Sequence, residues 1–148
     1  MISRFPLPAL GSLGLLLAAF FFQYVMGLAP CKMCIWQRWP HVAAILVGVA
    51  ILAGAPAKWR WIGFAAMVIC AGIAGYHTGV EYGWWEGPAS CSGGGDISAM
   101  SADDLLNQIQ NTAIVRCDEV AWRFLGLSMA AWNGIWSAVL AALWAVRR

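Results

Sequence analysis

The chain has 148 residues, of which 61% are hydrophobic and only 11% are charged, and its formal net charge is +2. A soluble domain averages about 45–50% apolar and about 25% charged residues, so this composition excludes an ordinary soluble protein. Because charge is scarce and nearly balanced, a disordered chain, a collagen-like repeat and a nucleic-acid-binding domain are excluded as well. The composition therefore indicates an integral membrane protein.

Four uncharged stretches divide the chain, and each is long enough to cross the hydrocarbon core as a helix, which takes about 20 apolar residues. Backbone polar groups cannot stay unpaired in lipid, so these stretches are expected to be helical. The expected membrane spans are about 7–27, 40–57, 61–80 and 124–146. The sequence therefore predicts a single all-α membrane domain, a four-helix transmembrane bundle.

An even number of spans places both chain ends on one side and the two loops at about 30–38 and 81–123 on the other. All acidic residues fall on the loop side, whereas the side with the chain ends carries five basic residues, which are Arg4, Lys58, Arg60, Arg147 and Arg148. The positive-inside rule counts Lys and Arg only, which are five on the side of the chain ends and four on the loop side. It predicts a multi-pass protein with both termini in the cytoplasm. Residues 1–29 are less suited to a cleaved signal peptide, because the apolar region exceeds the expected length of about 7–15 residues and Pro30 disfavours cleavage.

Four cysteines lie on the non-cytoplasmic side: Cys31, Cys34, Cys91 and Cys117. In an oxidising compartment they are expected to form disulfides, with three connectivities open, of which Cys31–Cys34 and Cys91–Cys117 is the simplest. A Cys-X-X-Cys ring adds little stability, so its usual value is thiol chemistry. A Cys₄ zinc site is the other use of these residues, but the oxidising location and the lack of a second short-spaced pair argue against any metal.

Arg38 follows Cys34 by four residues, so a helix starting near Met33 would place both on one face. The guanidinium could stabilise a thiolate and an anion formed beside it, or it could simply extend to the lipid headgroups. The neighbouring Cys-X-X-Cys favours the first interpretation. His77, at the exit of the third span, could donate a hydrogen bond to a ligand or be ordinary interfacial polarity. Cys70, inside that span, is expected to be a buried and inert thiol.

The long loop carries two further local signals. The segment Ser92–Gly95 after Cys91 is glycine-rich and suits a cysteine that must meet a partner. Ser101 then provides an N-cap for a short amphipathic helix that runs to about residue 113. This helix is expected to lie on the bilayer surface or to pack against its own loop.

Several segments together resemble one known family. They are Pro30-Cys31-X-X-Cys34-X-X-Gln37-Arg38, Tyr76–Glu81, Gly87-Pro88-X-X-Cys91, and the stretch from Cys117 to Asn133. In the same order, and over nearly the whole chain, they are similar to the disulfide bond formation protein B (DsbB) family of bacterial inner-membrane thiol oxidases.

The resemblance implies a four-span enzyme, a protein-dithiol:quinone oxidoreductase. A periplasmic DsbA-type thioredoxin-fold oxidase would attack the loop disulfide at Cys91, and Cys117 would pass electrons to Cys31. Cys34 would face a membrane quinone, ubiquinone or menaquinone, with Arg38 stabilising the anion formed there and His77 as a weaker quinone-site candidate. The chain's other expected partner is the lipid bilayer, and no nucleic acid is expected.

Two other function classes remain open from the residues alone. One is a non-catalytic membrane protein whose loops are held by two structural disulfides, and the other is a metal-handling, cysteine-rich membrane protein. Substitution of Cys34 separates the first from an oxidase, because only an oxidase would lose the ability to reoxidise a thiol partner.

Overall fold

The computed structural model describes residues 7–88, 91, 101, 103 and 115–146. The described part contains four long helices, which are α1 (Leu7–Tyr24), α2 (Lys32–Leu52), α3 (Arg60–Glu81) and α5 (Met129–Val146). A 3₁₀ turn, η2 (Ala57–Trp59), precedes α3, and an antiparallel pair, β1 (Arg123–Phe124) with β2 (Leu127–Ser128), precedes α5.

Each of the four long helices is long and apolar enough to cross a membrane. The predicted all-α, four-span architecture is therefore confirmed. The expected amphipathic helix near residues 101–113 and the segment Ser92–Gly95 lie outside the described residues, except for Ser101 and Asp103.

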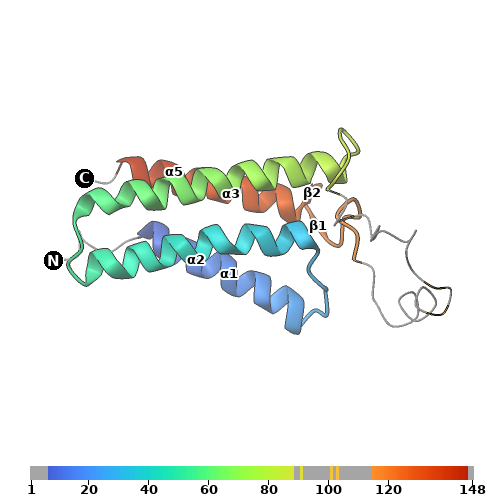
Figure 1. The fold of residues 1–148 in the computed structure, drawn as a ribbon, viewed down its shortest axis with the longest axis horizontal. Coiled ribbons are helices and arrows are strands. Elements are labelled where there is room, and N and C mark those ends of the chain that lie inside the picture. The colour runs from blue at the N-terminus through green and yellow to red at the C-terminus, as the bar shows by residue number, and fades with distance from the viewer. Residues whose placement is uncertain (1–6, 89–90, 92–100, 102, 104–114, 147–148) are drawn as a thin grey trace.

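The four helices run side by side along the long axis of the molecule (Figure 1). Helix α3 has its largest interface with α5 and the next largest with α2, whereas α1 packs mainly on α2. The start of α1, the end of α5 and the α2–α3 connection lie at one end of the bundle, and the β1–β2 hairpin lies at the other. The cysteine-bearing segments therefore share one end, as an even number of spans requires.

Small side chains let the helices approach closely in the interior, as is common where lipid supplies no hydrophobic driving force between helices. At Gly63 of α3, an added Cβ would lie 2.6 Å from the ring of Trp144 of α5. The buried apolar cluster at this level consists of Ala9, Ala44, Val47, Ala66, Met67, Cys70, Leu140, Ala141 and Trp144. Cys70 is fully buried within it, as expected.

Two helices begin at places that the uncharged stretches do not mark. Helix α2 starts at Lys32 rather than near residue 40, because Cys31 is its N-cap and its Sγ accepts a hydrogen bond from the Cys34 amide at 3.2 Å. Residues 32–38, expected in a loop, therefore form the first turns of a helix. An uncharged stretch shows which residues can lie in lipid, but the helix can continue beyond it into charged residues.

The fourth helix starts at Met129 rather than near residue 124, because a tight hairpin precedes it. Leu125 and Gly126 have φ angles of 51° and 80°, as a two-residue hairpin turn with both central residues left-handed requires. Ser128 then caps α5, its Oγ accepting from the amide of Ala131 at 3.1 Å. The hairpin keeps the start of α5 beside the end of α3.

Candidate functional site

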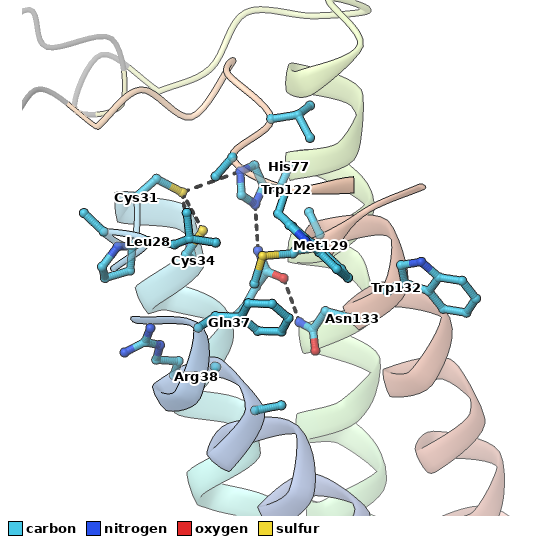
Figure 2. Close-up of a pocket in the computed structure, with 18 of the residues that line it drawn as sticks. Leu28, Cys31, Cys34, Gln37, Arg38, His77, Trp122, Met129, Trp132 and Asn133 are labelled. Atoms are coloured by element: carbon cyan, nitrogen blue, oxygen red, sulfur yellow. Dashed lines mark hydrogen bonds between the residues drawn. The ribbon is translucent and has the colours of Figure 1, made fainter. Parts of the chain in front are cut away.

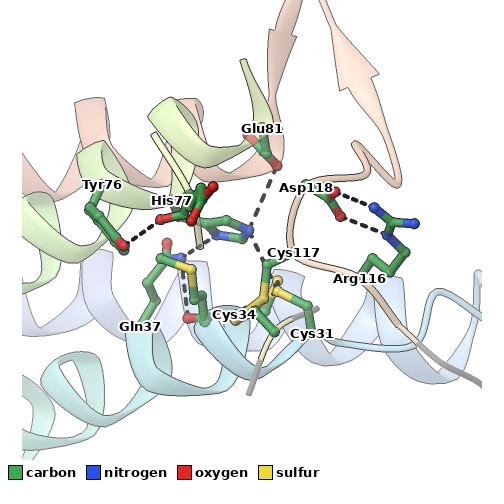
Figure 3. Close-up of a disulfide and its surroundings, with 12 residues drawn as sticks. Cys31, Cys34, Gln37, Tyr76, His77, Glu81, Arg116, Cys117 and Asp118 are labelled. Carbon is green, nitrogen blue, oxygen red and sulfur yellow. Dashed lines mark hydrogen bonds and ion pairs between the residues drawn. A yellow bond between two sulfur atoms is a disulfide. The ribbon is translucent and has the colours of Figure 1, made fainter. Parts of the chain in front are cut away.

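The two cysteine pairs meet at the hairpin end of the bundle. Cys91 and Cys117 form a disulfide with a Cα–Cα distance of 5.2 Å. Cys31 belongs to the same buried cluster, and Cys34 packs against it (Figure 3). Cys31 and Cys34 are thiols in direct contact, with their Sγ atoms 2.8 Å apart. The loops therefore bring together all four cysteines that the sequence singled out.

The arrangement of the sulfur atoms differs from that of a zinc site. Cys91 and Cys117 bond to each other and so offer no thiolates for a Cys₄ site. Ligand-type atoms of Cys31, Cys34 and His77 do lie within 4.8 Å of one another. Two thiolates on tetrahedral zinc, however, lie about 3.8 Å apart, because each Zn–S bond is about 2.3 Å long. A 2.8 Å Sγ–Sγ contact instead suits a pair that exchanges a disulfide.

Cys31 is the sulfur whose surroundings favour the thiolate. The hydrogen bond with the Cys34 thiol lowers the pKa of Cys31 to about 4, and burial opposes this shift only in part. His77 adds to the lowering, since its Nε2 lies 3.5 Å from the Cys31 sulfur. Because the thiolate is the nucleophile in disulfide exchange, Cys31 is prepared for that chemistry.

Arg38 lies in α2 one turn after Cys34, but its guanidinium is held by α1. Nη1 donates a 2.7 Å hydrogen bond to Oε1 of Gln23, and the guanidinium carbon lies 5.1 Å from the ring centre of Phe20. Arg38 and Cys34 nevertheless line the same cavity (Figure 2). The side chain is therefore fixed at the cavity wall by α1, a detail that the spacing of Cys34 and Arg38 could not reveal.

His77 is buried between the cysteines and the bundle interior. Its Nδ1 lies 2.8 Å from Nε2 of Gln37, and its Nε2 lies 3.9 Å from a carboxyl oxygen of Glu81. The Glu81 carboxyl also accepts a hydrogen bond from the Ser128 hydroxyl. His77 thus contacts the Cys31 sulfur directly, which is more than the interfacial polarity that the sequence left open.

A cavity of about 780 Å³ opens beside Cys31 and Cys34. Its wall is largely apolar, with Leu15, Leu16, Ala18, Ala19 and Phe22 from α1 and Met129, Trp132 and Trp136 from the α5 side. Gln37, Arg38, His77 and Asn133 supply polar atoms near the thiols (Figure 2), and His41, Glu81, Arg116 and Glu119 also line the cavity. A mostly apolar cavity with a few convergent polar groups is typical of a small-molecule site.

The disulfide itself is covered. Cys91 is 3% exposed and Cys117 is 1% exposed, with Val80 and Met33 in the same buried cluster. The groups packed around Cys91 must therefore move before a partner thiol can reach its sulfur. The sequence suggested an accessible cysteine, because a glycine-rich segment follows it.

Sequence reasoning missed four residues of the site: Gln37, His41, Glu81 and Asn133. Gln37 and Asn133 stood within the segments that carried the family resemblance, yet amide side chains have no chemical signature of their own. Their position could have identified them, because polar residues inside membrane spans usually face the bundle interior and take part in function.

Comparison with known proteins agrees with this arrangement. The family model described as "Disulfide bond formation protein DsbB" matches residues 3–147. A curated "Disulfide bond formation protein B" from Xanthomonas oryzae pv. oryzae (strain MAFF 311018) is 33% identical, over 97% of this chain and 87% of that protein. The protein of the same name from Xylella fastidiosa is 32% identical, over 88% of this chain and 79% of its own length. No solved structure matches. The chain therefore belongs to the DsbB family of multi-pass membrane oxidoreductases that generate disulfides.

Proposed function

We propose that this protein reoxidises a periplasmic DsbA-type thioredoxin-fold oxidase and passes the electrons to a membrane quinone, ubiquinone or menaquinone. The single observation that carries the proposal is the contact of a loop disulfide with a thiol pair at the mouth of an apolar cavity. The net reaction is partner dithiol plus quinone to partner disulfide plus quinol, with two electrons and two protons transferred.

The grouping of the four cysteines in one place supports the following thiol steps. A partner thiolate attacks Cys91, the Cys91–Cys117 bond breaks, and the partner's second thiolate releases its own disulfide. Cys117 then attacks Cys31 of an oxidised Cys31–Cys34 pair, and Cys34 leaves with the electron pair. Cys91 finally attacks Cys117, which restores the loop disulfide and leaves Cys31 and Cys34 reduced.

The cavity fits a quinone by the chemistry of its wall. The apolar side chains of α1 suit an isoprenoid-bearing ring that enters from lipid, and the Arg38 guanidinium supplies donors for a quinone oxygen. A bound quinone supplies a two-electron acceptor of high potential, which a strongly oxidising partner near −120 mV requires. The chain itself provides the thiols, fixes Arg38 through Gln23 and Phe20, and excludes water with its aromatic wall.

We further propose that the site faces the periplasm of the bacterial inner membrane and that both termini are cytoplasmic. Lys58 lies in the α2–α3 connection and Arg60 is the first residue of α3, at the end of the bundle opposite the four loop-side cysteines (Figure 1). Basic residues at that end support the orientation through the positive-inside rule.

A purified assay tests the proposal, with quinone absorbance followed in the presence of a reduced DsbA-type protein. The wild-type protein is expected to reoxidise the partner over many turnovers, whereas Cys34→Ser should not, because Cys117 then has no Cys31–Cys34 disulfide to attack. A purely structural role of the cysteines predicts no partner reoxidation by either protein. Arg38→Ala is expected to raise the KM for quinone. Arg60→Ala is the matched control, because its guanidinium also lies over a ring, that of Trp61 at 5.0 Å, but at the other end of the bundle. An unchanged KM in Arg38→Ala would remove Arg38 from the site.

A further inference from the structure

A row of polar side chains crosses the bundle interior below the cysteines. It consists of His77 from α3, Gln37 and His41 from α2 and Asn133 from α5, and Figure 2 shows three of its members joined by hydrogen bonds. Gln37 is 5% exposed, and His41 and His77 are each 3% exposed. Polar groups are costly to bury inside a membrane, so a connected row of them calls for a functional reason.

The direction of the hydrogen bonds is set at Gln37. Its Nε2 lies 3.3 Å from the backbone oxygen of Met33, a contact that only the nitrogen of the amide can make favourably. The same nitrogen lies 2.8 Å from Nδ1 of His77, and the amide oxygen accepts from Nδ2 of Asn133 at 2.7 Å. Because Gln37 donates to Nδ1, the proton of a neutral His77 must be on Nε2.

The orientation of Asn133 follows from that of Gln37. With Nδ2 donating to Gln37, Oδ1 of Asn133 faces Nε2 of His41 at 3.0 Å, so His41 also carries its proton on Nε2. The remaining nitrogen of His41, Nδ1, has no hydrogen-bond partner among the described residues. The row therefore begins at an unprotonated nitrogen deep in the bundle, and every donor in it points toward the cysteines.

The last donor of the row, Nε2 of His77, contacts the Cys31 sulfur. Nε2 of His77 lies 3.5 Å from that sulfur and 3.9 Å from the Glu81 carboxyl, which already accepts from Ser128. The backbone amide of Cys34 donates to the same sulfur at 3.2 Å, and the Cys34 thiol touches it at 2.8 Å. Several donors converge on one sulfur, which is the environment of a thiolate.

We propose that His41, Asn133 and Gln37 are positioning residues that hold His77 neutral, with its N–H directed at the Cys31 sulfur. The inference rests on the proposed function in one respect, because it takes Cys31 to be a relay cysteine. His77 then acts as a fixed hydrogen-bond donor to the thiolate and not as a base that removes its proton. A base would need Nε2 unprotonated, and Gln37 would have to turn its oxygen toward His77 and away from Asn133.

The titratable groups that face Cys31 are Cys34 on its own helix and His77 and Glu81 on α3. On the loop side it contacts the Cys91–Cys117 disulfide, which does not titrate. Arg38, Arg116 and Glu119 are the other charged side chains that line the adjoining cavity. Of all these groups, His77 is the one whose proton position the row controls.

Nitrogen NMR of the reduced protein, with ¹⁵N-labelled imidazoles in detergent at neutral pH, tests the proton positions without any substitution. The chain has two histidines, and both are expected as neutral rings protonated on Nε2, so no assignment is needed. A ring protonated on Nδ1, or a doubly protonated ring, would overturn the proposal.

A second measurement follows the pH dependence of Cys31 alkylation, resolved by peptide mass spectrometry in the reduced full-length protein. Gln37→Leu is expected to raise the midpoint by about one to two pH units, since His77 loses its fixed orientation. Asn133→Leu is expected to act in the same direction but less strongly, because Met33 still orients Gln37. His77→Gln, which keeps a side-chain N–H, should retain more of the wild-type midpoint than His77→Leu.

Ser137→Ala is the matched control, a buried polar side chain on α5 one turn beyond Asn133. It is expected to leave the Cys31 midpoint unchanged. A wild-type midpoint in folded Gln37→Leu would refute the positioning role, and if that variant does not fold, the NMR result on the wild-type protein decides. Neither measurement uses quinone or a partner protein. If the Cys31 midpoint shifts in Gln37→Leu but the wild-type protein reduces no quinone, the proposed function is rejected and the positioning role stands.

Discussion

Ser128 connects two helices at the site, and its removal has an effect that can be worked out from its contacts. Ser128 is 1% exposed, and its hydroxyl accepts from the Ala131 amide at 3.1 Å and donates to the buried carboxyl of Glu81. Loss of an N-cap costs about 1 kcal/mol. Loss of a hydrogen bond to a carboxylate costs about 1.5–3 kcal/mol. Ser128→Ala is therefore expected to lower the free energy of unfolding by about 3 kcal/mol, more than a hundredfold in the folding equilibrium.

The assay is unfolding by sodium dodecyl sulfate in mixed micelles, followed by helical circular dichroism. Ser128→Thr keeps both hydrogen bonds and is expected to remain close to wild type. Ser128→Asp keeps the cap but places a second carboxyl beside Glu81, so it should lose stability despite capping the helix. In a double-mutant cycle, Glu81→Gln should show coupling with Ser128→Ala. A Ser128→Ala protein within about 0.5 kcal/mol of wild type would refute this account of the α3–α5 connection.

Three further predictions concern packing, backbone conformation and pH. Gly63→Ala is expected to destabilise the bundle by about 1–3 kcal/mol, because its Cβ would lie 2.6 Å from the Trp144 ring. Gly72→Ala, with nothing within 4 Å of its Cβ, should be neutral or stabilising when both variants are unfolded by sodium dodecyl sulfate in the same way. Leu125→Asn is expected to stabilise the hairpin by about 1 kcal/mol, because asparagine tolerates the left-handed conformation better; a loss of stability would show that the leucine side chain contributes more than its strain costs. In the reduced protein, the folded state lowers the pKa of Cys31 from 9.0 to about 4, so the unfolded state binds the proton more readily. The resulting stability should be fully present above about pH 9 and lost as the pH falls through about 4, and denaturation midpoints that are flat across this window would contradict it.

The sequence by itself determined the class of fold and singled out four cysteines as the candidate reactive sulfurs. Four uncharged stretches long enough for helices specify four spans, because lipid leaves the backbone no other way to pair its polar groups. The parity of the spans puts Cys31, Cys34, Cys91 and Cys117 on one side, and the Cys-X-X-Cys spacing made Cys31–Cys34 the predicted reactive pair. These conclusions depend only on the composition of each segment, the number of spans and the spacing of the cysteines.

Only the tertiary structure decided how the site is arranged. It showed that α2 begins at Lys32, that α1 holds Arg38, and that His77 contacts Cys31. It also joined Gln37 to Asn133, two residues far apart in the sequence. A span is recognised by its average polarity, which tolerates a few polar side chains and does not say which of them face each other. Their partners depend on how each helix is rotated about its axis, and that rotation is set by packing between helices that no single segment encodes.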